Sequence, residues 1–319
     1  MNGGPVPAQA QAQAQARVRG LPIAYYTVGA EHLPVVLCLH GFLDHGLSFA
    51  PIAEALRDRW RFVLVDFRGH GASGWIGSGG YYHFPDYVTD ALAVIRAVGA
   101  ERFSILAHSM GGSVAAFLAA TLGSRVDAMV LLEGMGPPEE DLTHAPDRLR
   151  RWTEALIEPG VDGDVEARRA ARRPMKSVEE AIARMQRTNP RLSTARARAL
   201  VLSSSEPHGD GVAWRFDPLH RTPSARPFNR VEMMSFFRRV EQPVLSLYGD
   251  ATEWALPDLA ERHRALSGAQ VGVVEGAGHN VHHDRPDVVT RAVAAWFGGD
   301  RPAIIEGVRP ARAEPEEAR

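Results

Sequence analysis

Short apolar runs alternate with amphipathic segments along most of the chain. Runs of strand length, several of them apolar throughout like VVLCL at 35–39, lie at residues 21–28, 35–39, 62–65, 103–107, 128–132, 244–248 and 270–274. Segments of helical periodicity lie between them, at residues 49–56, 87–98, 111–122, 256–266 and 284–297. Continuous apolar strands are typical of a sheet covered on both faces, and strands that alternate with helices form parallel sheets. The pattern therefore predicts an α/β fold with a mostly parallel central sheet and helices on both faces.

The alternation breaks between residues 137 and 242, where helical pieces occur but no apolar run suggests a buried strand. We interpret residues 137–242 as a helical cap, inserted after the run at 128–132 over the carboxyl ends of the strands. Residues 18–136 and 243–300 then form the core domain. Residues 1–17 contain the low-complexity tract AQAQAQAQA, so we expect a disordered tail there, and the charged, proline-containing residues 301–319 are expected to form a second tail.

Composition restricts the class of protein. The chain has 319 residues, of which 45% are hydrophobic and 23% charged, as in ordinary globular proteins. The formal net charge is -2, so the chain lacks the overall basic charge that is typical of nucleic-acid-binding proteins. The chain has a single cysteine, Cys38, which excludes an internal disulfide. It contains no apolar run of about 18 residues, so no membrane span is predicted. Residues 1–17 lack the basic and apolar regions of a signal peptide, so we expect a cytoplasmic protein.

A short motif joins a predicted strand to a predicted helix at residues 107–111. The sequence there is AHSMG, which matches the pattern G-x-S-x-G with alanine in place of the first glycine. Small residues on both sides of Ser109 allow the strand and the helix to pass closely. The N-terminus of the helix offers free N–H groups that stabilise an anion beside the serine. This local structure suits a nucleophilic serine.

Three further loops follow predicted strands. HGF at 40–42 follows the run at 35–39, DFRGHGAS at 66–73 follows the run at 62–65, and GAGHN at 276–280 follows the run at 270–274. Together with the serine motif, and in this order, they resemble the α/β-hydrolase superfamily over about residues 20–298. The sequence is therefore identified as a member with a helical cap.

The resemblance implies roles for particular residues. Ser109 is the expected nucleophile and His279 its general base, and the backbone N–H groups of Phe42 and Met110 are expected to form the oxyanion hole. The loop at 66–73 is expected to be structural. His108 and Trp214 are the expected substrate-binding residues, although Trp214 alternatively packs the cap on the core.

The carboxylate that orients the histidine is left open. Its commonest site in the superfamily follows the strand at 244–248, but that position holds Thr252, and Asp250 and Glu253 are out of register. A second location, known from haloalkane dehalogenases, is the end of the strand after the nucleophile helix, where this chain has Glu133. A carboxylate there is costly to bury without a partner, and His279 would be that partner. Glu133 and Asp250 are the leading candidates.

These features predict a serine hydrolase that cleaves a carboxylic ester or thioester of a small acyl substrate through an acyl-enzyme at Ser109. The same residues suit an amidase, a lactonase or a C–C bond hydrolase, and a ligand-binding protein without turnover is the alternative of another class. No organic cofactor or metal is required. His279, His282 and His283 cluster with Asp284 in the sequence, but adjacent histidines point differently and Asp284 is expected to cap the last helix. The oligomeric state is left open.

Overall fold

The computed structural model describes residues 14–158, 160–226, 228–254, 256–266, 268–301 and 305–311. The strands are β1 (Ala14–Val18), β2 (Leu21–Val28), β3 (Val35–Leu39), β4 (Arg61–Val65), β5 (Phe103–His108), β6 (Val126–Leu132), β7 (Ser205–His208), β8 (Gly211–Trp214), β9 (Val244–Gly249), β10 (Gln270–Val274) and β11 (Val308–Pro310). The α-helices are α1 (Ala50–Leu56), α2 (Phe84–Val98), α3 (Met110–Leu122), α4 (Ala145–Leu156), α5 (Val165–Ala170), α6 (Val178–Thr188), α7 (Thr194–Ser204), α8 (Arg230–Phe237), α9 (Leu259–Ala265), α10 (Val281–Asp284) and α11 (Pro286–Phe297). Short 3₁₀ helices are η1 (Gly46–Phe49), η2 (Gly123–Arg125), η3 (Leu142–His144) and η4 (Pro218–Arg221).

Within the described residues, nine strands form one sheet in the order β1-β2-β4-β3-β5-β6-β9-β10-β11. Neighbouring strands from β4 to β10 are parallel. The edge strands β1 and β11 pair antiparallel with β2 and β10, and β2 pairs antiparallel with β4. This confirms the predicted mostly parallel sheet, and it places the carboxyl ends of β3, β5, β6, β9 and β10 along one edge.

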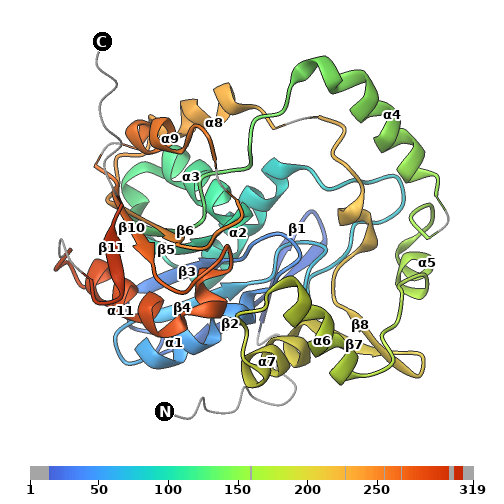
Figure 1. Cartoon of the computed structure of the whole chain (residues 1–319), viewed down its shortest axis with the longest axis horizontal. Coiled ribbons are helices and arrows are strands. Elements are labelled where there is room, and N and C mark those ends of the chain that lie inside the picture. The colour runs from blue at the N-terminus through green and yellow to red at the C-terminus, as the bar shows by residue number, and fades with distance from the viewer. Residues whose placement is uncertain are drawn as a thin grey trace.

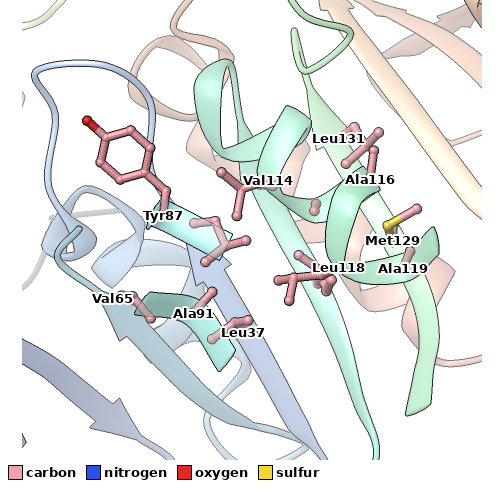
Figure 2. Packing of buried hydrophobic residues seen from close by; sticks show 14 of the residues in the cluster. Leu37, Val65, Tyr87, Ala91, Val114, Ala116, Leu118, Ala119, Met129 and Leu131 are labelled. Atoms are coloured by element: carbon pink, nitrogen blue, oxygen red, sulfur yellow. The ribbon is translucent and has the colours of Figure 1, made fainter. Parts of the chain in front are cut away.

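Helices cover both faces of the sheet (Figure 1). Successive side chains of a strand face opposite sides, so Leu37 belongs to one apolar cluster and Cys38 to the other. On the first face, Leu37 and Met129 lie in the cluster that Ala91 of α2 and Val114 of α3 complete (Figure 2). On the second face, α1 and α11 pack against the sheet. In the described part of the chain, no helix is both long enough and apolar enough to cross a bilayer.

Residues 14–17 correct the expectation of a disordered tail over residues 1–17. They form most of β1, which joins β2 through a turn at Arg19 and Gly20, both with positive φ (50° and 88°). Ala16 and Val18 are buried in the cluster that includes α2, whereas Gln15 and Arg17 are exposed. The tract alternates apolar and polar residues with a period of two, which suits a strand with one buried face, and its low complexity hides this period. Residues 1–13 lie outside the described residues.

Part of the expected C-terminal tail over residues 301–319 also belongs to the sheet. β11 pairs antiparallel with β10, with Pro310 opposite Gly272, and Ile305 is buried in the second cluster. The charged composition of this end concealed a strand of three residues. Residues 302–304 and 312–319 lie outside the described residues.

The segment after β6 forms a cap beside the core, where α4 to α7 are drawn in green to olive in Figure 1. Its small apolar cluster includes Met175, Ile182 and Leu200. Two features differ from the predicted helical cap over residues 137–242. The hairpin β7–β8 lies inside it, and α8 packs on α3, with Met233 and Phe237 in the core cluster. The final part of this range therefore belongs to the core, because α8 buries its apolar side against α3.

Candidate active site

Four loops that leave the carboxyl edge of the sheet carry the residues singled out by the sequence. Phe42 follows β3, Ser109 follows β5, Glu133 follows β6 and His279 follows β10. Their strands belong to one parallel set, so the loops leave the sheet at the same edge. Ligands of α/β proteins bind at this edge.

Ser109 lies in a strained turn between β5 and α3. Its backbone has φ 49° and ψ -116°, a conformation that L-residues rarely adopt. The turn is held by the N–H of Ser109, which donates to the carbonyl of Leu132 at 2.9 Å, and by the N–H of Gly112, which donates to the carbonyl of Ser109 at 2.9 Å. Met110 is the first residue of α3, and the first N–H groups of a helix have no partner within it. The N–H of Met110 is therefore available to an anion.

The two glycines after Met110 are required by close backbone contacts. A Cβ at Gly111 would overlap the backbone of Leu39, and a Cβ at Gly112 would overlap the backbone of Gly134. α3 can therefore begin immediately after β5 only where these positions lack side chains.

Replacing Gly112 with alanine is expected to lower the free energy of unfolding by about 3 kcal/mol, because backbone atoms cannot move aside as a flexible side chain can. Gly77→Ala is the matched control, since a Cβ at Gly77 meets nothing within 4 Å. Urea denaturation of both variants measures the difference. Equal unfolding midpoints for Gly112→Ala and wild type would contradict the close contact.

Ser109, His279 and Glu133 lie in contact in this order. Nε2 of His279 is 3.0 Å from Oγ of Ser109. Nδ1 of His279 is 3.5 Å from Oε2 of Glu133, which is longer than a hydrogen bond, and it makes none with the described residues. Such distances are often long in free enzymes and shorten with substrate bound. The Glu133 side chain is 2% exposed, and its Oε1 accepts from the N–H of Gly249 at 2.9 Å.

The structure places the two other candidate carboxylates differently. Asp250 is exposed, and its Oδ1 accepts from the N–H groups of Gly276 at 2.9 Å and Ala277 at 3.3 Å. Glu253 is also exposed. Of the alternatives that the sequence left open, Glu133 is thus the carboxylate brought to His279, whereas Asp250 holds the backbone of the loop that carries this histidine.

The loop after β3 lies against the serine turn. A Cβ at Gly41 would be only 3.2 Å from Cβ of Ser109. Leu43 has φ 59°, and its N–H donates to Nε2 of His70 at 3.2 Å, which fixes the loop from its far side. The side chain of Phe42 between them is 50% exposed, so its backbone and not its ring is the part held beside Ser109.

Two buried histidines, both of them neutral, hold this loop through hydrogen bonds. Nδ1 of His40 donates to the carbonyl of Gly41 at 2.6 Å, and Nε2 accepts from the N–H of Phe67 at 3.0 Å. Nδ1 of His70 donates to the carbonyl of Arg68 at 3.0 Å. Burial lowers the pKa of His40 to about 3 and that of His70 to about 4. Both rings therefore keep one donor and one acceptor nitrogen at neutral pH.

The loop at 66–73 has the structural role that the sequence predicted. The buried carboxylate of Asp66 accepts from the N–H groups of Gly46 at 2.7 Å and Ala72 at 2.8 Å, so it joins two loops. Arg68 pairs with the buried Asp90 of α2 at 2.6 Å. These contacts support the loop after β3 without reaching Ser109 directly.

The two residues expected to bind substrate are placed elsewhere. His108 is 2% exposed, and its Nε2 donates to the carbonyl of His279 at 3.0 Å. It holds the histidine loop and leaves almost no surface for a ligand. Trp214 lies in β8 and packs against the apolar cluster of the cap. The structure does not bring it to Ser109 by any contact between described residues.

The cap binds both functional loops. Asp284 does not cap the last helix, which begins at Pro286; its oxygens accept from the N–H of Gly278 at 2.9 Å and from Nδ2 of Asn189 at 2.6 Å. Nη2 of Arg196 in α7 donates to the carbonyl of Ser48 at 2.8 Å. The cap therefore contacts Asp284, which holds the loop of His279, through Asn189, and it contacts the segment after β3 through Arg196.

One residue beside His279 was not singled out from the sequence. Trp254, in the loop after β9, is 50% exposed, and its ring centre lies 5.4 Å from that of His279. An aromatic residue in a loop at the carboxyl edge of the sheet was the available signal.

A cavity of about 870 Å³ lies between the β1–β2 turn and α4. It is bounded by side chains that include Leu21, Ile76, Trp152, Leu156 and Arg168. Ser109, Glu133 and His279 do not line it. This cavity is therefore separate from the cluster of Ser109, His279 and Glu133.

Comparison with known proteins gives consistent results. The chain matches the family model described as "alpha/beta hydrolase fold" over residues 34–286. It is 29% identical to the "Serine hydrolase-like protein" of Danio rerio over 287 residues, which cover 87% of this chain and 86% of the relative. A crystal structure of a hypothetical protein from Pseudomonas aeruginosa PAO1 superposes with a TM-score of 0.78 at 28% identity, over 90% of this chain and 98% of the other. A thioesterase domain from the curacin biosynthetic pathway shares the fold, with a TM-score of 0.76 at 23% identity over 88% of this chain and 97% of that domain.

Proposed function

Because the chain belongs to the alpha/beta hydrolase fold family, we propose that it is a serine hydrolase that cleaves a carboxylic ester or thioester through an acyl-enzyme at Ser109. The observation that carries the proposal is the 3.0 Å contact between Oγ of Ser109 and Nε2 of His279. A hydroxyl in a strained turn at a helix N-terminus, beside an imidazole acceptor, is the arrangement of an activated serine nucleophile.

In the proposed reaction, Oγ of Ser109 attacks the acyl carbonyl while Nε2 of His279 accepts its proton. The carbonyl oxygen becomes negatively charged and accepts hydrogen bonds from the N–H groups of Phe42 and Met110. Collapse of this intermediate breaks the bond to the leaving alcohol or thiol, which takes the proton from His279. Water, deprotonated by His279, then attacks the acyl-enzyme and releases the acid.

Glu133 orients His279 in this proposal. A carboxylate near Nδ1 keeps the proton on that nitrogen, so Nε2 remains the acceptor that faces Ser109. The positive φ of Glu133, 51°, turns the chain sharply at the end of β6. The N–H of Gly249 holds the other carboxylate oxygen, so the oxygen near His279 has little freedom to move.

The leaving group is assigned from chemistry and from relatives. An alcohol or thiol leaves more readily than an amine, which favours an ester or thioester over an amide as the substrate. The fold shared with a thioesterase domain supports a thioester as well as an ester. A small acyl compound is therefore the proposed substrate.

Labelling with a fluorophosphonate probe tests the proposal. The folded protein is expected to take up one probe per chain, with the modified peptide containing Ser109, because only an activated serine reacts readily. Incubation with an activated p-nitrophenyl ester is expected to show an acyl adduct at the same residue.

Ser113→Ala is the matched control, because Ser113 is a buried hydroxyl one turn further along α3. It should be labelled as the wild type is, whereas Ser109→Ala and heat-denatured protein should not. A folded wild-type protein that takes up no probe would indicate a ligand-binding protein instead.

A further inference from the structure

A buried group of two histidines and one aspartate lies beside the proposed active site. Asp44 follows β3, His108 ends β5 and His282 lies in α10. One potential ligand atom from each residue lies within 4.8 Å of the other two. His108 is 2% and His282 0% exposed, and the Asp44 side chain is 13% exposed. None of these three side chains has a role in the acyl-transfer steps.

His108 has a ring nitrogen without a partner. Its Nε2 faces the carbonyl of His279 at 3.0 Å, so Nε2 carries the proton and donates. Nδ1 therefore has a free lone pair, and it makes no hydrogen bond with any residue the structure describes. A buried polar atom without a partner is unusual and calls for a ligand.

Asp44 and His282 are spaced as two ligands of one metal ion would be, and Nε2 of His282 has a second neighbour in Oγ of Ser48 at 3.3 Å. Oδ2 of Asp44 is 3.4 Å from Nε2 of His282, whereas charge-assisted hydrogen bonds are about 2.7–2.9 Å long. Two ligands of a tetrahedral zinc ion, each at about 2.0–2.1 Å from the metal, are about 3.3 Å apart. Nε2 of His283 lies 3.3 Å from the same oxygen and is a second neighbour of this carboxylate.

We propose that Asp44, His108 and His282 bind one divalent transition-metal ion, with Zn²⁺ as the best match. Two imidazoles and one carboxylate form the protein ligand set of zinc sites that leave a fourth position for water. Imidazole nitrogens favour Zn²⁺ and similar ions over Ca²⁺ or Mg²⁺.

Surrounding groups hold the ligands in place. The carbonyl that accepts from Nε2 of His108 is the outer partner that a metal-bound histidine commonly has. Phe49 stacks on the ring of His282, with 4.7 Å between ring centres. Arg196 donates to the carbonyl of Ser48, whose Oγ lies 3.3 Å from Nε2 of His282, so a cation lies close to the site. Binding must therefore come from ligand bonds and not from excess negative charge.

Such an ion would fasten three segments of the site. Asp44 is two residues from Phe42, His108 precedes Ser109, and His282 is three residues from His279. The ion takes no part in the proposed acyl transfer, and its binding does not depend on that function.

Metal titration of the tag-free, chelator-treated protein tests the proposal. Competition with a chromophoric zinc chelator is expected to show one Zn²⁺ per chain, and Co²⁺ is expected to give visible absorption bands of low coordination number. His282→Gln and Asp44→Asn should each weaken Zn²⁺ binding by at least about 100-fold. Zn²⁺ should also raise the melting temperature of the wild type but not of these variants.

His83→Gln is the control, because it alters an exposed histidine that has no contact with the Asp44, His108 and His282 group and should bind Zn²⁺ as the wild type does. Equal affinity in the wild type and in the His282→Gln and Asp44→Asn variants would overturn the proposal. Absence of a one-to-one site in the wild type would overturn it even if a variant fails to fold. Fluorophosphonate labelling is a separate measurement, so failure here is distinguishable from failure of the serine hydrolase proposal.

Discussion

Replacing His279 with alanine is expected to lower kcat/KM for an activated ester by about 10⁶-fold, the size seen when a catalytic base is removed from a serine hydrolase. The reason is the 3.0 Å contact of its Nε2 with Oγ of Ser109. Without that acceptor, the hydroxyl keeps its proton and is a poor nucleophile. Steady-state hydrolysis of a p-nitrophenyl ester by the purified variant measures the loss.

The double variant with Ser109→Ala makes this test stricter. Two residues that act as one unit are not additive, so the double variant should be little slower than His279→Ala alone. His83→Ala, which removes an exposed imidazole elsewhere, should retain wild-type activity. If the effects of the two single variants multiplied in the double variant, Ser109 and His279 would act independently and the proposed mechanism would be wrong.

Replacing Glu133 with glutamine is expected to lower kcat/KM by about 10⁴-fold, because an amide can hold the histidine with its proton on the wrong nitrogen. Glutamine keeps an oxygen that accepts from the N–H of Gly249, so the fold should be retained. Ester hydrolysis, together with the rate of fluorophosphonate labelling, measures the effect.

Asp250→Asn provides the comparison that separates the two carboxylates. Asparagine keeps the oxygen that accepts from Gly276 and Ala277, and Asp250 has no described contact with His279. Its kcat/KM should equal that of the wild type. A large loss in Asp250→Asn with full activity in Glu133→Gln would move the role to Asp250.

The sheet was predicted correctly, and Ser109 and His279 were chosen as candidates, because their signals in the sequence are local. Each residue follows an apolar strand directly or within a short glycine-containing loop, and parallel strands end at one edge of a sheet. The orienting carboxylate could not be chosen in this way. Glu133 and Asp250 follow the neighbouring strands β6 and β9, and only the positions of their side chains separate them.

Two side chains lie where local patterns did not place them. His108 is adjacent to Ser109 in the chain, but β5 turns its side chain into the protein, where it holds the loop of His279. Asp284 lies just before the last helix, where an N-cap residue is expected. It instead binds Asn189 of the cap segment and the N–H of Gly278. Both outcomes depend on contacts between segments far apart in the chain, which local patterns do not encode.

The first strand has a consequence of its own. The sequence alternates alanine and glutamine, and successive side chains of a strand point to opposite faces. A shift of the strand by one Ala-Gln unit would therefore place alanines on the same face again. Alignment with β2 must then be set by what lies beyond the repeat, namely the buried Val18 and the tight turn at Arg19 and Gly20. Adding or removing one Ala-Gln unit is therefore expected to leave Val18 opposite Leu21, because these three residues set the alignment.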